Sequence, residues 1–240
     1  MPNSTDQDPN LQDPARLNQL RQSVEQSVGN IKVKALHALT QGQAPRAGEE
    51  GAGGAPSHYP VQWIQELHSQ VDLLAQTAQL STGAFACKEG CTSCCHARVE
   101  VTPPEVFAIA NYLAAEQEDR RPVFISRLVS RSAAPAPESH WSTRPACALL
   151  VDNRCSVYPV RPAACRKGHS YDAQACKADQ AELPLHYGFV LGAEVWMAGV
   201  AQGYEAAGFQ SPILELCDAL LKVLQNPQMQ SDWLEGRSVF

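Results

Sequence analysis

Hydrophobic residues recur at helical spacing in the first part of the chain. Leu20, Val24 and Val28 lie four residues apart and are flanked by Gln, Lys and Arg side chains. Apolar positions at steps of three or four line one face of a helix. The pattern predicts an amphipathic helix over residues 18–39, inside an N-terminal helical segment of residues 1–40.

The composition changes after this segment. Residues 41–56 are rich in Gly and Pro and include charged side chains. Such a stretch buries too little apolar surface to offset the entropy lost on ordering. We therefore expect residues 41–56 to be a flexible linker and residues 57–240 to form the main domain.

Helical spacing also dominates the rest of the chain. Thr102-Pro103-Pro104-Glu105 is a helix start, because threonine caps the first turn, proline suits it and glutamate completes a capping box. The predicted helices run through Ile64–Ala78, Thr102–Leu113, about Pro122–Ser130, about His186–Ala207 and about Pro212–Leu224. In the last of these, one apolar face is expected to carry Ile213, Leu216, Leu220 and Leu224.

One short stretch predicts strands instead of a helix. Cys147-Ala-Leu-Leu-Val is followed by Asp152-Asn153 and then by Arg154-Cys155-Ser-Val-Tyr158. A polar pair between two apolar runs favours a tight β-hairpin. This hairpin would bring Cys147 close to Cys155. The expected fold class is therefore mainly α, with a small helical domain and one short β-hairpin.

The cysteine content is the most unusual feature of the composition. The chain has nine cysteines in 240 residues, and its first residues are polar and acidic, unlike a secretory signal. We therefore expect a cytoplasmic protein, where thiols stay reduced and disulfides are scarce. An odd number of cysteines also fits a complete set of disulfides poorly, and this favours metal binding.

Eight of the nine cysteines fall between residues 87 and 176. Short Cys-x3-Cys and Cys-x2-Cys spacings let thiolates from one turn reach the same ion, and Gly90 allows a sharp bend between the first two cysteines. Soft thiolates select zinc, copper(I) or iron-sulfur clusters. The candidate metal ligands are Cys87, Cys91, Cys94, Cys95, Cys147, Cys155, Cys165 and Cys176.

The arrangement of these ligands stays open at this point. Cys94 and Cys95 are adjacent, so their side chains should diverge and should not share one tetrahedral ion. Eight thiolates then fit two four-ligand centres, one polynuclear cluster, or one centre with spare redox-active thiols. Cys217 lies on the apolar stripe of a helix with no cysteine nearby in sequence, and we expect it to pack in the core.

The second half of the cysteine-rich segment carries a more specific motif. Cys147, a short hairpin and Cys155-Ser-Val-Tyr158-Pro-Val-Arg161-Pro162-Ala-Ala-Cys165-Arg166 follow a cluster that ends in Cys-Cys. This order resembles the YkgJ-type cysteine-cluster (CxxCxxCC) family of zinc- or iron-chelating domains. The resemblance covers about residues 85–176. The motif is also similar to that of flagellin lysine N-methylases, which implies S-adenosylmethionine-dependent chemistry in some relatives.

Other residues of the motif suggest contributions to the centre. Arg161 and Arg166 could offset the negative charge of a four-thiolate centre and donate to sulfur, or could form ordinary salt bridges. Tyr158 is expected to pack over the hairpin and is grouped with these arginines as cofactor-binding. His96 and His169 lie near cysteines in sequence and could add an imidazole ligand, although a surface or supporting role is commoner.

The preferred function is a metal-binding protein that acts in electron transfer or metal handling. An iron-sulfur cluster is favoured over zinc, because the vicinal cysteines and the long gap from Cys95 to Cys147 fit simple zinc ribbons poorly. The alternatives are a cluster-dependent enzyme, such as a lysine methyltransferase or an oxidoreductase, and a structural zinc adaptor. A net charge of −6 and short apolar runs argue against nucleic acid and membranes as partners, while the N-terminal helix could bind another protein.

Overall fold

The computed structural model describes residues 13–42, 58–133, 145–178 and 182–240, and it confirms a mainly α-helical fold. None of the helices in these ranges has the length and apolar character needed to cross a membrane. The α-helices are α1 (Pro14–Gly42), α2 (Tyr59–Thr82), α3 (Pro103–Glu116), α4 (Arg121–Ser132), α5 (Ala163–Lys167), α6 (Ala173–Lys177), α7 (Tyr187–Ala206), α8 (Leu216–Gln225) and α9 (Gln228–Leu234). The short 3-10 helices are η2 (Ser93–His96), η3 (Glu118–Arg120) and η5 (Tyr158–Val160).

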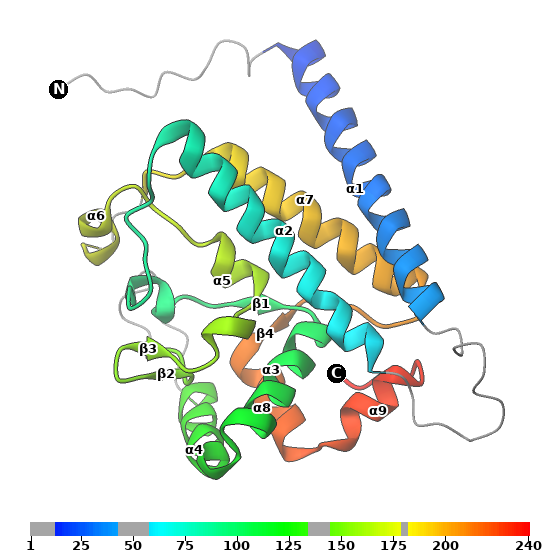
Figure 1. Ribbon diagram of the computed structural model, residues 1–240, viewed down its shortest axis with the longest axis vertical. Coiled ribbons are helices and arrows are strands. Elements are labelled where there is room, and N and C mark those ends of the chain that lie inside the picture. The colour runs from blue at the N-terminus through cyan, green and yellow to red at the C-terminus, as the bar shows by residue number, and fades with distance from the viewer. Residues whose placement is uncertain (1–12, 43–57, 134–144, 179–181) are drawn as a thin grey trace.

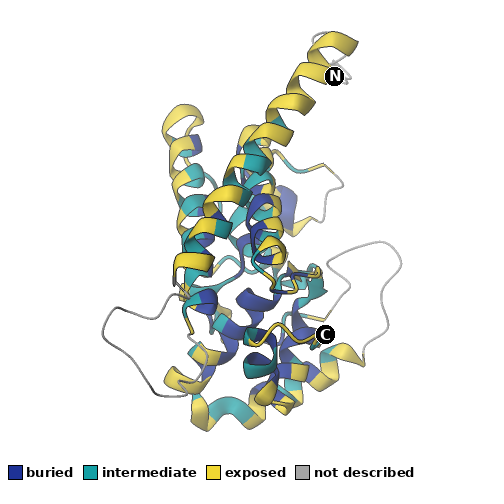
Figure 2. Ribbon diagram, turned by 90° about the vertical axis from the view of Figure 1, so that its right-hand side faces the viewer, coloured by how far each residue is buried: buried dark blue, intermediate teal, exposed yellow. Residues whose placement is uncertain are grey.

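The three longest helices form one half of the molecule. Helices α2 and α7 pack side by side, and α1 packs along α7 (Figure 1). The predicted N-terminal helix is thus confirmed, and much of its apolar face is used within the chain. Its first turns project beyond the rest of the protein, where Leu17 and Leu20 are exposed (Figure 2). The predicted linker lies almost wholly outside the described residues.

The other half is built around α3 and α8, with α4 packed on α8. Their apolar faces meet in a core that contains Phe107, Leu220 and Trp233, all fully buried. Ile64 and Val71 of α2 extend the same core toward α7. The predicted helices at α2, α3, α4 and α7 are therefore confirmed.

The last predicted helix is wrong at its start. Residues 212–215 are not helical, because Leu214–Glu215 form strand β4, which pairs antiparallel with β1 (Glu100–Val101). The Glu215 side chain then accepts the N–H of Asp218 and caps α8. Ile213 is 61% exposed and does not share the buried face of Leu216, so periodicity alone placed it wrongly.

The predicted hairpin is present. Strand β2 (Leu150–Val151) pairs antiparallel with β3 (Arg154–Cys155). The two turn residues, Asp152 and Asn153, have φ values of 50° and 59°. Both are left-handed, as a two-residue turn with the twist of a hairpin requires, and Asp and Asn tolerate this conformation better than most residues.

Candidate metal centre

The eight candidate cysteine ligands lie in two stretches of the chain, residues 87–95 and 147–176, and the fold gathers them on one side of the molecule. Figure 1 shows η2, the hairpin, α5 and α6 on the same side of the paired helices α2 and α7. Backbone hydrogen bonds fasten these segments to each other. The N–H of Cys147 donates to the carbonyl of Cys95 at 2.7 Å, and the N–H of Ala86 donates to the carbonyl of Ser170 at 2.8 Å.

One group of thiols surrounds Cys87. Burial, together with repulsion from the neighbouring Cys91, Cys94 and Cys176, raises the pKa of the Cys87 thiol to about 11. Such repulsion weakens with distance, so Cys91, Cys94 and Cys176 lie near Cys87. Gly90 has a φ of 85°, so the predicted bend between Cys87 and Cys91 is confirmed.

A second group surrounds Cys165 on α5. Burial raises the pKa of the Cys165 thiol, and the nearby Cys94 and Cys155 raise it further. Cys147 interacts in the same way with Cys165 and Cys155. The hairpin has therefore brought Cys147 and Cys155 near each other, as expected.

Cys94 and Cys95 join the two groups. The prediction that their side chains diverge is wrong for the free thiols, because the two side chains hydrogen-bond to each other on the tight turn of η2. This bond lowers the pKa of Cys94 to about 7 and raises that of Cys95. Cys94 is also exposed, so it is an accessible thiol with substantial thiolate character near neutral pH.

Backbone amides point at several of the sulfur atoms. The N–H of Leu149 donates to Cys147, and the N–H of Val157 donates to Cys155. In both cases the donor lies two residues after the cysteine and favours the thiolate, although burial outweighs it at Cys155 and raises the pKa of that thiol. Donation to sulfur stabilises a thiolate and is typical of the supporting contacts around a thiolate-bound metal.

Arg161 supplies positive charge beside this group. Its guanidinium favours the thiolate forms of Cys94, Cys155 and Cys165, and at Cys155 and Cys165 it partly offsets the burial that raises their pKa values. The guanidinium carbon lies 3.8 Å from the centroid of the Tyr158 ring, so Tyr158 supports Arg161 through a cation–π contact. The structure thus places Arg161 where it can offset thiolate charge.

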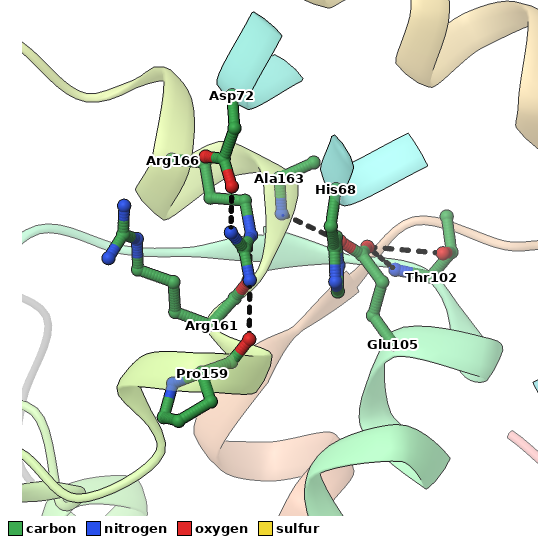
Figure 3. A network of polar contacts seen from close by, with 8 residues as sticks. All are labelled: His68, Asp72, Thr102, Glu105, Pro159, Arg161, Ala163 and Arg166. Atoms are coloured by element: carbon green, nitrogen blue, oxygen red, sulfur yellow. Dashed lines mark hydrogen bonds and ion pairs between the residues drawn. The ribbon is translucent and has the colours of Figure 1, made fainter. Parts of the chain in front are cut away.

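Arg166 is placed differently, and its donors are used elsewhere. Its guanidinium forms an ion pair with Asp72 of α2 at 2.5 Å and also donates to the carbonyls of Arg161 and Pro159 (Figure 3). The side chain is 8% exposed. Arg166 therefore corresponds to the salt-bridge alternative: it links α5 to α2 and to the segment that contains Arg161.

Glu105 was recognised in the sequence only as a capping residue. It does cap α3, accepting the N–H of Thr102 at 2.9 Å, but its carboxylate is also buried and accepts the N–H of Ala163 at 2.8 Å. His68 of α2 lies 3.5 Å from the same carboxylate (Figure 3). Burial acts to raise the pKa of Glu105, and the contacts with His68, Ala163 and Thr102 outweigh it and lower the pKa. No local sequence pattern connects Glu105 to Ala163.

The two candidate histidines differ in their placement. His169 is buried, its Nε2 accepts the N–H of His186 at 2.7 Å, and its Nδ1 bonds to the carbonyl of Lys167 at 2.9 Å. Both ring nitrogens are thus in use, and the ring packs against Phe85. His169 therefore has a supporting role in this structure. His96 lies close enough to Cys94 for its charge to lower the pKa of that thiol.

The ninth cysteine has an unexpected neighbour. Cys217 is 3% exposed and belongs to the hydrophobic core, as predicted. Its side chain also hydrogen-bonds to that of Cys147. No pattern in the sequence predicts this contact, because the two residues lie 70 positions apart.

The residues present match a soft metal in donor chemistry. Within the described ranges, no three His, Cys, Asp or Glu side chains already surround a point where a metal ion could sit. The thiols are instead gathered in pairs and small groups, with amide N–H donors and one guanidinium beside them. This set suits an ion or cluster that prefers sulfur.

Comparison with known proteins agrees with this chemistry. Residues 86–182 match the family model CxxCxxCC, described as a putative zinc- or iron-chelating domain. The match spans all eight candidate ligands, and Cys217 lies outside it. No curated protein and no solved structure matches the chain. Residues 86–182 are therefore similar to the CxxCxxCC family of zinc- or iron-chelating domains, and this similarity covers less than half of the chain.

Proposed function

We propose that the protein binds metal through its gathered thiolates as a polynuclear centre, and that this centre is an iron-sulfur cluster. The observation that carries the proposal is the interaction of Cys94 with thiols of both groups, Cys87 in one and Cys165 in the other. A single zinc ion takes four ligands, whereas the linked groups contain eight thiols. A centre with more than one metal atom can bind more of these eight thiols than one zinc ion can.

The charge around the thiols supports the same proposal. A cluster with four thiolate ligands is an anion, and hydrogen bonds to sulfur together with local charge set its reduction potential. The amides of Leu149 and Val157 and the guanidinium of Arg161 provide such contacts here. We infer a role in electron transfer or metal handling. We also infer a reducing compartment such as the cytosol, since none of the nine cysteines forms a disulfide.

We also infer that residues 57–240 form the metal-binding domain and that the N-terminal helix is a flank. Every cysteine lies in the larger segment. The described part of the flank, α1, packs on α7. Removal of residues 1–42 takes away no cysteine, so the remaining domain is expected to bind metal, while the loss of α1 exposes the face of α7 on which it packs.

The decisive experiment is the measurement of iron, zinc and acid-labile sulfide in protein purified without oxygen. Iron with sulfide and visible absorption would support the proposal. Stoichiometric zinc in a colourless protein would contradict the cluster and would indicate a structural zinc site. Protein that binds neither metal after reconstitution would contradict metal chelation altogether.

Two cysteine variants connect the metal to this site. Cys94→Ser and Cys165→Ser are expected to lose bound metal and to destabilise the protein, because each removes a thiolate that interacts with several others. Ser93→Ala, in the same turn as Cys94, is the control and should retain its metal. Full metal in both cysteine variants would exclude these residues as ligands.

A further inference from the structure

A cavity of about 590 Å³ lies between α2, α3, η5 and α5. Cavities of this size are typical of small-molecule sites. The described residues that line it include none of the eight candidate cysteine ligands. The cavity is therefore distinct from the groups of thiols, although α5 contributes Arg166 to the one and Cys165 to the other.

His68 of α2 is buried in the wall of this cavity, with an exposed fraction of 5%. Its Nε2 atom lies 3.5 Å from the Glu105 carboxylate, longer than a normal hydrogen bond, and has no hydrogen-bond partner within the described residues. A buried ring nitrogen without a partner is unfavourable, so its presence indicates that a partner is missing. A polar group held in the cavity would supply that partner.

The mouth of the cavity is polar but uncharged. Its neutral polar side chains are Gln62, Gln65, Ser69, Asn111 and Tyr112. Each of these amides and hydroxyls can both donate and accept a hydrogen bond. All except Tyr112 are exposed and thus accessible from solvent. This set matches a ligand whose own groups both donate and accept, as hydroxyl groups do.

The charged groups of the lining neutralise each other. Asp72 forms its ion pair with Arg166 at 2.5 Å, and the other two guanidinium nitrogens donate to the carbonyls of Arg161 and Pro159 (Figure 3). Neither a phosphate nor an ammonium group would therefore meet an unpaired charge among the described lining residues. The cavity thus favours an uncharged ligand over an ionic one.

From this combination we propose that the cavity binds a small uncharged ligand that carries several hydroxyl groups, such as a sugar or another polyol. The amides at the mouth and the imidazole of His68 hydrogen-bond to its hydroxyl groups. Val61, Ala108 and Val160 form the apolar part of the lining and contact its C–H groups. The proposal goes beyond the metal-binding function and does not depend on it, because no thiol takes part.

The test is a saturation-transfer NMR titration of the full-length protein with methyl α-D-glucopyranoside, an uncharged sugar. Saturation transfer to the sugar protons is expected in the wild type. Gln65→Leu and Asn111→Leu each remove one amide and should weaken binding by about 2- to 10-fold, the effect of one lost hydrogen bond. His68→Leu should weaken it by a similar factor, and circular dichroism checks the fold of this buried variant. The two variants at the exposed mouth keep the test valid if His68→Leu folds poorly.

Gln76→Leu is the matched control, because Gln76 is also exposed on α2 and lies outside the lining of the cavity. It should bind the sugar like the wild type. No saturation transfer in the wild type, or an equal loss in Gln76→Leu, would overturn the proposal. Displacement of the sugar by inorganic phosphate or by tetramethylammonium would also overturn it, since the site would then select a charged ligand. None of these outcomes bears on the metal content, which is measured separately.

Discussion

The carboxylate of Glu105 accepts a hydrogen bond from the backbone N–H of Ala163, 58 residues later in the chain, at 2.8 Å. Ala163 is the first residue of α5, the helix that carries Cys165. Glu105 is at the same time the capping residue of α3. One buried side chain thus couples the start of a core helix to the segment that positions a candidate ligand.

Replacement of Glu105 by alanine should destabilise the protein strongly. The change leaves the N–H groups of Ala163 and Thr102 without their acceptor and removes the partner of His68, and loss of one member of a buried pair costs about 3–5 kcal/mol. Urea denaturation measures the free energy of unfolding. Glu116→Ala, at an exposed position of the same helix, is the control and should change it little. Equal effects of the two changes would show that the buried contacts of Glu105 contribute nothing.

Cys94 should be the thiol that reacts first in the metal-free protein. The hydrogen bond from Cys95 lowers the pKa of Cys94 to about 7, whereas burial raises that of Cys87 to about 11. Since the thiolate is the nucleophile, the alkylation rate of Cys94 by iodoacetamide should rise through a midpoint near pH 7. Peptide mass spectrometry assigns the modified residue.

The positive charge of Arg161 contributes to this reactivity. Arg161→Gln should move the midpoint for Cys94 to higher pH, because the guanidinium favours the thiolate. The control is Arg154→Gln in the hairpin, an exposed arginine, which should leave the midpoint in place. An unchanged midpoint in Arg161→Gln would contradict the placement of this charge beside Cys94.

His169 should make the metal-free protein less stable in acid. Burial lowers its pKa from the ordinary value of 6.5, so the unfolded chain binds its proton more readily than the folded one. The contribution of the neutral ring is complete above pH 6.5 and is lost as the pH falls through the lower, folded-state pKa. Urea midpoints measured between pH 7.5 and pH 5 should decrease, and His169→Gln should flatten this decrease. His37→Gln, at an exposed position on α1, should retain the full dependence.

The contact between α1 and α7 depends on small residues. A Cβ at Gly199 would lie 2.6 Å from the Cβ of Ile31, and one at Gly203 would meet the Cβ of Ala35 even more closely. Gly203→Ala should therefore lower the free energy of unfolding by about 1–3 kcal/mol through overpacking. Gly29→Ala on α1, where nothing lies within 4 Å, should instead raise it by about 0.5–1 kcal/mol. Thermal or urea unfolding of the two variants shows whether the changes in the free energy of unfolding have opposite signs.

The sequence alone determined the features that depend on short spacing. Helical periodicity located α1 and α2, and the Thr102–Glu105 pattern predicted the start of α3, because the residues concerned are neighbours along one helix. The Asp152-Asn153 turn and the cysteine spacing predicted the hairpin and a metal-chelating segment in the same way. Each of these signals lies within a few residues.

Only the tertiary structure decided how distant segments meet. The pairing of β1 with β4 replaced the expected first turn of α8, and it placed Cys217 beside Cys147. Chain folding likewise separated the two arginines, sending Arg161 toward the thiols and Arg166 to Asp72. These outcomes depend on contacts between segments far apart in sequence. Pairing of β4 with β1 stabilises residues 214–215 more than a helical turn would, and such a contact leaves no periodic pattern in the sequence.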